Sequence, residues 1–305
     1  MNRMKIIDAH VHLVQTIAGT GAGGALRAIG GGRVMYDDGA SFQMIPPEMG
    51  EDQVSPEAVL AVMNAHQVEK AVLLQGNFAG FQNIYSYEAA RRYPDRFLAA
   101  ASYDPFCLRC EGIRRHLFEE LGIRVVKFEV STGSGLMSNH GVLPLDGDVM
   151  EREYAYADDH SLVFVVDIGK LGSDSSQIPA LRRAILRHSS MTFVVCHLLA
   201  PKRGMEWEMR EGLRQLCLSN VWFDLASLPS NLRDTPPFEG ARYFTHAAVE
   251  IVGADRLIFG TDMPFNLCSA TYQSLVDSVQ EDPGLSLSQK QVILYDNACR
   301  VFFGG

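Results

Sequence analysis

The chain has 305 residues, of which 47% are hydrophobic and 21% charged, and its formal net charge is -9. This balance is typical of a folded globular protein and excludes an intrinsically disordered chain. The negative charge argues against sequence-independent binding to nucleic acid or to an anionic membrane surface. No stretch of 18 consecutive apolar residues occurs, so the sequence predicts no membrane span.

The cysteine pattern and the amino-terminal residues indicate the cellular compartment in which the protein works. Six cysteines are spread over the chain without the spacing of a disulfide framework, which is typical of a reducing environment. The amino-terminal sequence lacks a long apolar segment of the kind found in secretory signals. We therefore expect a cytoplasmic protein. We also expect a small, anionic substrate and no nucleic-acid or membrane partner. The sequence leaves open whether it forms a homo-oligomer.

Eight short apolar runs recur along the chain, and segments with helical spacing, such as 55–66 and 174–188, lie between them. Buried strands that alternate with helices indicate a parallel sheet covered on its outer face. Eight such units favour a closed (β/α)8 TIM barrel over an open sheet. No linker or repeat divides the chain, so we predict a single domain over residues 1–305. The runs are 5–13, 70–76, 97–104, 123–130, 162–169, 191–199, 221–226 and 256–262.

Residues 14–54 form the longest stretch without a strand or helix pattern, and they are rich in glycine. Long irregular loops in compact domains are commonly functional, so this segment is either an active-site lid or a surface excursion. Its residues 19–24 match G-x-G-x-x-G. Dinucleotide binding requires a helix directly after that motif, and the sequence predicts none here, which argues against a nucleotide site.

Asp8, His10 and His12 alternate along the first run. In a strand these three side chains share one face, and Ile7 and Ala9 share the other, which we expect to meet the helices. Two imidazoles at the carboxyl end of a barrel strand can together bind one divalent ion. The alternative is a pair of buried histidines that only make hydrogen bonds. Their position in the first of eight strands favours the metal site.

Asp262 ends the eighth run, where the barrel opens. A carboxylate at the carboxyl end of a TIM-barrel strand lies on the catalytic face, so Asp262 can reach a metal ion or its water. The alternative is a helix N-cap. His197 ends the sixth run, and we expect it to be a catalytic acid or base, although a ligand or structural role is also possible. Its neighbour Cys196 should point away from the site.

Two further polar residues lie at strand ends. Asp167 ends the fifth run, where it could bind the metal or orient a histidine. Lys127 shares a face of the fourth strand with Glu129. Lys127 could pair with Glu129, bind an anionic substrate, or become carbamylated and bridge metal ions.

Together these residues resemble the amidohydrolase-2 branch of the amidohydrolase superfamily, which includes aminocarboxymuconate-semialdehyde decarboxylase. The matching segments, in order, are IIDAHVHL (6–13), FVVCHLLAP (193–201), RLIFGTDMPF (256–265) and NACRVF (297–302). The resemblance implies a TIM barrel in which His10 and His12 bind a metal ion. It also implies that His197 is catalytic and that Asp262 is both a ligand and a proton acceptor.

The sequence departs from this family at Asp167, where many members have a ligand histidine. An additional carboxylate shifts the preference of a site from zinc toward manganese or magnesium. The other possibility is a weakly bound or absent metal, as in some lactonases of the superfamily. We expect one divalent ion, with zinc as the first candidate. The predicted ligands are His10, His12, Asp262 and Asp167.

The expected reaction is hydrolysis of a small C–N or C–O substrate, such as a lactone, an ester or a cyclic amide, by a metal-activated water. Asp262 would accept the proton of the water, and His197 would stabilise the oxyanion or protonate the leaving group. One alternative is nonoxidative decarboxylation of an unsaturated or aromatic acid, with Lys127 or Arg124 near the carboxylate. Another is a binding barrel whose catalytic site has degraded.

Overall fold

The computed structural model describes residues 4–304. Eight parallel strands form one sheet in the order β1-β6-β7-β8-β9-β10-β11-β12, and each overlaps one of the eight predicted runs. Hydrogen bonds from Ala9 N to Phe259 O (3.0 Å) and from Asp262 N to His10 O (2.8 Å) join the last strand to the first. The predicted TIM barrel is therefore confirmed. The strands are β1 (Ile6–Val11), β6 (Val68–Leu73), β7 (Phe97–Ala101), β8 (Val125–Glu129), β9 (Val163–Asp167), β10 (Phe193–Val195), β11 (Val221–Asp224) and β12 (Leu257–Ile258).

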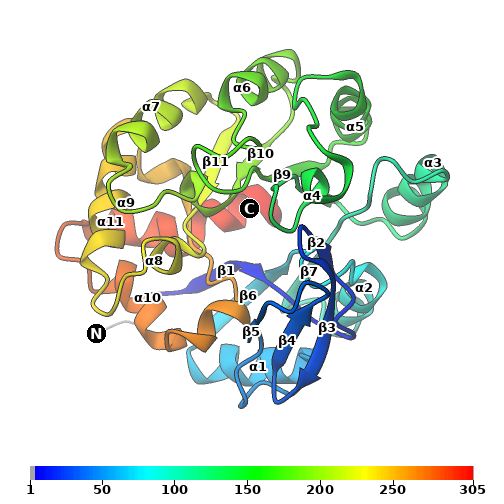
Figure 1. The fold of residues 1–305 in the computed structure, drawn as a ribbon. Helices are drawn as coiled ribbons and strands as arrows, with labels where there is room; N and C mark the ends of the chain where they lie inside the picture. Colours follow the sequence, from blue (N-terminus) through cyan, green and yellow to red (C-terminus); the bar gives the residue numbers. More distant parts are fainter. Residues whose placement is uncertain (1–3, 305) are drawn as a thin grey trace.

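Helices connect the strands and surround the sheet (Figure 1). For example, α6 (Ile178–Arg187) buries Leu181, Ala184 and Ile185, which share one helical face. Within the described residues, no helix is long and apolar enough to cross a bilayer. The other helices are α1 (Pro56–Ala65), α2 (Asn83–Arg92), α3 (Cys110–Arg114), α4 (Leu136–His140), α5 (Asp148–Asp159), α7 (Glu206–Leu216), α8 (Leu228–Asn231), α9 (Glu239–Val252), α10 (Tyr272–Gln280), α11 (Leu287–Gln291) and α12 (Asn297–Phe302). Shorter helical segments are η1 (Arg115–Glu120), η2 (Cys196–Leu199), η3 (Ala254–Arg256), η4 (Phe265–Cys268) and η5 (Val292–Asp296).

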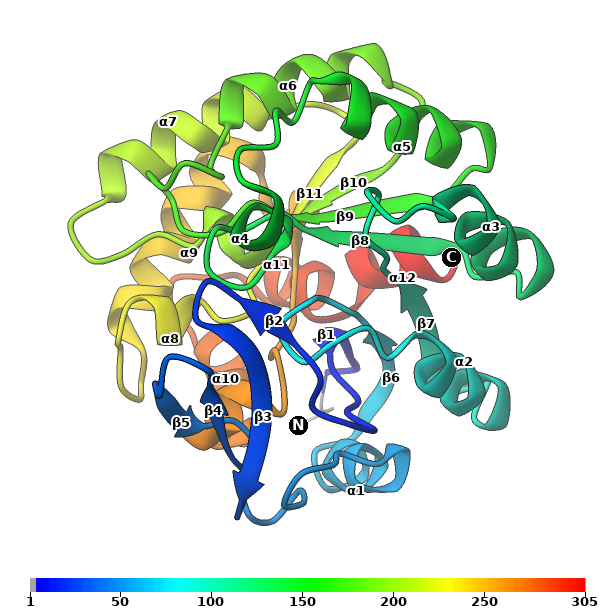
Figure 2. The same cartoon turned by 45° about the vertical axis from the view of Figure 1, so that its right-hand side comes forward.

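The segment 14–54, predicted to lack regular structure, contains a second sheet of four antiparallel strands. Figure 2 shows this small sheet, in dark blue, as a layer outside the barrel. Hydrogen bonds from Ala18 N to Ala79 O (3.1 Å) and from Ala22 N to Gly133 O (2.9 Å) attach it to the loops after β6 and β8. The segment therefore lies at the carboxyl ends of the barrel strands, and its role as a lid stays a prediction. Its strands are β2 (Thr20–Gly21), β3 (Gly24–Gly30), β4 (Arg33–Tyr36) and β5 (Ser41–Gln43).

The two faces of β1 differ from those expected. Ile7 and Ala9 pack inside the barrel with Val165 of β9, whereas Val11 belongs to the core beneath the helices. The prediction that Ile7 and Ala9 meet the helices is therefore wrong. The register between β1 and β6 shifts between Asp8 and Val11, and such a bulge changes which residues face inward on either side of it.

Asp8 points away from the cavity as a consequence of this irregularity. Its Oδ2 accepts hydrogen bonds from the hydroxyls of Thr261 (2.6 Å) and Tyr272 (2.9 Å), and its Oδ1 accepts one from Thr261 N (2.9 Å). Asp8 is completely buried. It therefore joins β1 to the loop after β12 and to α10, and so supports the position of the nearby site residues.

We expect Asp8→Ala to lower the free energy of unfolding by on the order of 3 kcal/mol, because it leaves several buried donors without an acceptor. Chemical denaturation would measure the change. The matched control is Asp52→Ala, since Asp52 is an exposed carboxylate. Equal stability of the two variants would contradict this role of Asp8.

Candidate active site

A cavity of about 390 Å³ opens at the carboxyl ends of the barrel strands. In TIM-barrel enzymes this end carries the active site. Of the residues that the sequence analysis assigned to catalysis, substrate binding or metal binding, all but Arg124 line this cavity. They are His10, His12, Lys127, Asp167, His197 and Asp262.

His10, His12 and Asp262 form a compact group, with one possible ligand atom from each within 4.8 Å of the others. Asp262 Oδ1 lies 3.0 Å from His12 Nε2 and 3.8 Å from His10 Nε2. Two imidazole nitrogens and a carboxylate oxygen beside an open cavity are typical donors of a catalytic zinc site. These three residues therefore fit a divalent ion.

Asp224, at the end of β11, orients His10. Its Oδ2 lies 3.0 Å from His10 Nδ1, which leaves Nε2 directed into the site. A carboxylate commonly fixes the tautomer of a metal-binding histidine in this way. Burial, and then the charge of Lys127, lower the pKa of His10 well below its usual value, so the ring is neutral. The sequence analysis missed Asp224, although its position at a strand end is the signal that identified Asp167 and Asp262.

The backbone turns sharply after β10. His197 and the three residues that follow it have positive φ angles, and His197 has a φ of 60°. Such left-handed residues are costly and commonly persist at functional sites. Cys196 follows Val194 in the strand alternation and is buried inside the barrel, where its Sγ groups with nitrogens of His10 and His197. The left-handed turn that begins at His197 directs this next side chain into the cavity as well. The prediction that Cys196 points away from the site is therefore wrong.

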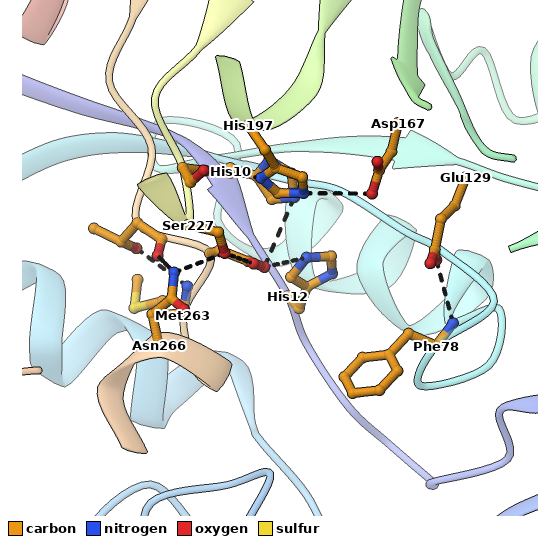
Figure 3. A network of polar contacts seen from close by, with 12 residues as sticks. His10, His12, Phe78, Glu129, Asp167, His197, Ser227, Met263 and Asn266 are labelled. Atoms are coloured by element: carbon orange, nitrogen blue, oxygen red, sulfur yellow. Dashed lines mark hydrogen bonds and ion pairs between the residues drawn. The ribbon is translucent and has the colours of Figure 1, made fainter. Parts of the chain in front are cut away.

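His197 is placed between hydrogen-bond acceptors. Its Nδ1 is 2.9 Å from Ala226 O, and its Nε2 is 3.4 Å from Asp167 Oδ2 (Figure 3). Burial alone lowers the pKa of His197, but the carboxylates, Asp167 above all, raise it to about 10. His197 is therefore an imidazolium at neutral pH, because both ring nitrogens face acceptors.

Asp167 lies outside the compact group of possible ligands. It pairs with His197, and its Oδ1 also accepts a hydrogen bond from Gly169 N (2.8 Å). Of the roles considered from the sequence, this geometry corresponds to orienting a histidine. Metal ligation by Asp167 stays a prediction.

Lys127 extends from β8 into the same part of the cavity. Its Nζ lies 3.1 Å from His10 Nε2, and the side chain is buried. Burial lowers the pKa of Lys127, but Cys196 and then the surrounding carboxylates raise it above its usual value. Within residues 4–304, Lys127 forms no ion pair with Glu129 that is shorter than 4.0 Å. Glu129 instead accepts hydrogen bonds from Ser131 and Ser134.

Asp262 is held from its other side. Its Oδ2 accepts a hydrogen bond from the hydroxyl of Ser227, which itself accepts one from Asn266 Nδ2 at 2.9 Å (Figure 3). Asp262 and Ser227 both have left-handed backbones, with φ angles of 60° and 58°. Burial raises the pKa of Asp262, but the hydrogen bond from His12 and the nearby imidazoles lower it below its usual value. The carboxylate is therefore ionised and faces the cavity instead of capping a helix.

The sequence model of the amidohydrolase family matches residues 7–304 of this chain. The chain belongs to the amidohydrolase family. The family resemblance drawn from the sequence motifs is thereby confirmed. A search of curated proteins finds no significant match.

Solved structures share this amidohydrolase fold at low sequence identity. A probable 2-pyrone-4,6-dicarboxylic acid hydrolase from Acinetobacter baumannii, with citric acid bound, is 16% identical, with a TM-score of 0.70 over 98% of this chain and 100% of that chain. A Burkholderia multivorans amidohydrolase with bound zinc is 18% identical, with a TM-score of 0.70 over 98% and 99% of the two chains. A 2,6-dihydroxybenzoate decarboxylase from Rhizobium is 16% identical, with a TM-score of 0.56 over 81% and 88%.

We expect Asp167→Asn to lower the pKa of the His197 imidazole by about 1–3 pH units, because the substitution removes the carboxylate nearest to it. NMR titration of the 15N-labelled histidine rings in metal-free protein would measure this change. Glu129→Gln is the matched control, since Glu129 lies in the same cavity but contacts Ser131 and Ser134. An unchanged His197 pKa together with lost zinc affinity would instead identify Asp167 as a metal ligand.

Proposed function

We propose that this amidohydrolase is a metal-dependent hydrolase of a small carbonyl compound with a negative charge, such as a lactone, an ester or a cyclic amide. The observation that carries the proposal is the pairing of opposite protonation states in one cavity. Asp262 Oδ1 lies 3.0 Å from His12 Nε2, a contact that lowers the pKa of this carboxyl group, whereas His197 Nε2 lies 3.4 Å from Asp167 Oδ2, a contact that raises the pKa of this imidazole. Two titratable groups whose environments separate their pKa values in this way are suited to act as base and acid.

His10, His12 and Asp262 would hold the divalent ion. We infer zinc as the first candidate and manganese or magnesium as alternatives, because the donors are two imidazoles and a carboxylate. A bound ion would lower the pKa of a water molecule and polarise a carbonyl oxygen. The zinc in the Burkholderia multivorans structure supports this proposal.

The protein groups would divide the proton transfers between them. Asp262 accepts the proton of the attacking water, while the Ser227 hydroxyl keeps the carboxylate directed at the cavity. His197 then donates its proton to the leaving oxygen or nitrogen, and Asp167 stabilises the imidazolium before that transfer. Lys127 contributes positive charge near the oxygen on which negative charge develops.

An aromatic wall limits the shape of the substrate. Phe78 and Phe265 both line the cavity and meet edge to face, with their ring centres 5.1 Å apart. Phe265 also lies 4.9 Å from the ring of His12. Because this wall is close to the proposed metal ligands, it would pack against the face of a flat ring whose carbonyl group reaches them.

Decarboxylation of an unsaturated or aromatic acid is the alternative. It is supported by the buried Lys127 ammonium, which could bind a substrate carboxylate, and by the fold similarity to a decarboxylase. Arg124 does not contribute, because it precedes the amino end of β8 and does not line the cavity. A degraded binding barrel is disfavoured, since both candidate proton-transfer groups and the three candidate ligands converge on one cavity.

We expect the zinc-loaded protein to release acid from lactones or esters in a panel of small carbonyl compounds. A parallel panel of unsaturated and aromatic acids, followed by CO2 release, tests the alternative reaction. Asp262→Asn should abolish acid release, because it removes the base. Release of CO2 without any acid from the first panel would contradict the hydrolase proposal.

His197→Asn should leave zinc content nearly unchanged and lower turnover by about two to four orders of magnitude, the usual contribution of a positioned acid–base group. Metal analysis and steady-state kinetics would separate these two effects. The control is His116→Asn, because His116 is exposed and does not line the cavity. Loss of zinc in the His197 variant would identify this residue as a ligand.

A further inference from the structure

We propose that Lys127 competes with the divalent ion, so that its ammonium group and the metal alternate at the same nitrogen, His10 Nε2. This inference rests on the metal site of the proposed function. It adds a role for a residue that is neither a ligand nor one of the two proton-transfer groups. The consequence is a site whose metal affinity is held down by the protein itself.

The first step concerns the available electron pair. His10 Nδ1 faces Asp224 Oδ2 at 3.0 Å, so Nδ1 carries the proton of the neutral ring and Nε2 has only a lone pair. Lys127 Nζ lies 3.1 Å from that nitrogen. An ammonium group can only donate hydrogen bonds. The lone pair that would bind the ion is therefore already used by Lys127.

The second step concerns the charge of Lys127. Only 2% of this residue is exposed, and a buried ammonium normally pairs directly with a carboxylate. Within the described part of the chain, Lys127 has no such partner within 4.0 Å, and its nearest polar contact is a neutral imidazole. The carboxylates of Asp167, Glu129 and Asp262 surround it at longer range. This is the environment of a cation site in which a lysine takes the position of an ion.

The third step is the alternative position of the lysine. Glu129 follows Lys127 on the same face of β8, and the register of β8 and β9 places Glu129 opposite Asp167. An ammonium displaced from His10 therefore has the carboxyl groups of Glu129 and Asp167 on its own strand and on the neighbouring one. Because like charges at short range repel strongly in a buried site, metal binding requires that displacement.

Zinc titration of metal-free protein tests the proposal without any substrate. We expect Lys127→Met to bind zinc at least about tenfold more tightly than the wild type, because it removes the competing charge and keeps the apolar length of the side chain. The matched control is Lys170→Met, since Lys170 is an exposed lysine that lines the same cavity. Its zinc affinity should stay within about twofold of the wild type.

A second variant and a second measurement separate competition from loss of folding. Lys127→Gln is also uncharged, and it should tighten zinc binding in the same direction if thermal melting shows a folded protein. In metal-free protein, the 15N chemical shift of His10 Nε2 should change in both Lys127 variants, because the hydrogen bond from the ammonium is lost. It should not change in Lys170→Met.

Each outcome bears on a different part of the account. Equal or weaker zinc binding by both folded Lys127 variants would overturn the competition while leaving the metal site of the wild type intact. Weaker binding would in addition favour a lysine that acts as a ligand, as a carbamylated side chain would. Absence of zinc binding in every variant would overturn both the competition and the proposed metal site.

Discussion

The hydrogen bond from Asp262 N to His10 O, 2.8 Å long, joins the last strand of the barrel to the first, and the site depends on this junction. It brings together residues from opposite ends of the sequence, which contribute the ligands of the proposed metal site. Asp8 reinforces the junction by binding the backbone and hydroxyl of Thr261. The contact that closes the barrel therefore also assembles the site. Loss of this strand pairing would separate Asp262, the proposed base, from His10 and His12.

The charges in the cavity are arranged so that most have a fixed partner. His197 is paired with Asp167, Asp262 with His12, and His10 with Asp224. Lys127 differs from them, since among the described residues its ammonium has no carboxylate within 4.0 Å and faces the neutral ring of His10. In a buried site of low dielectric, such interactions are stronger than in water, so the partners determine which group carries a proton. These contacts are the basis for proposing His197 as the acid, Asp262 as the base and Lys127 as the cation that competes with the metal.

Much of the fold could be predicted from the sequence because buried parallel strands give nearly continuous apolar runs, and all eight were found. The sheet formed by β2 to β5 was missed. Its two longer strands, β3 and β4, bury only Leu26 and Val34, so the sequence shows no alternation of apolar and polar residues long enough to predict a strand. Strand alternation correctly placed Lys127 in the cavity. It failed at Ala9, because the register of β1 shifts before Val11, and at Cys196, because a left-handed turn directs its neighbour His197 into the cavity as well.

The most direct test of the central claim is a crystal structure of the zinc-loaded protein with anomalous scattering at the zinc edge. The account predicts one strong peak bonded to His10, His12 and Asp262, with His197 unbonded and still paired with Asp167. The ammonium of Lys127 should have turned away from His10. A peak bonded to other residues, or zinc bound by His10 while Lys127 keeps its present contact, would contradict the account.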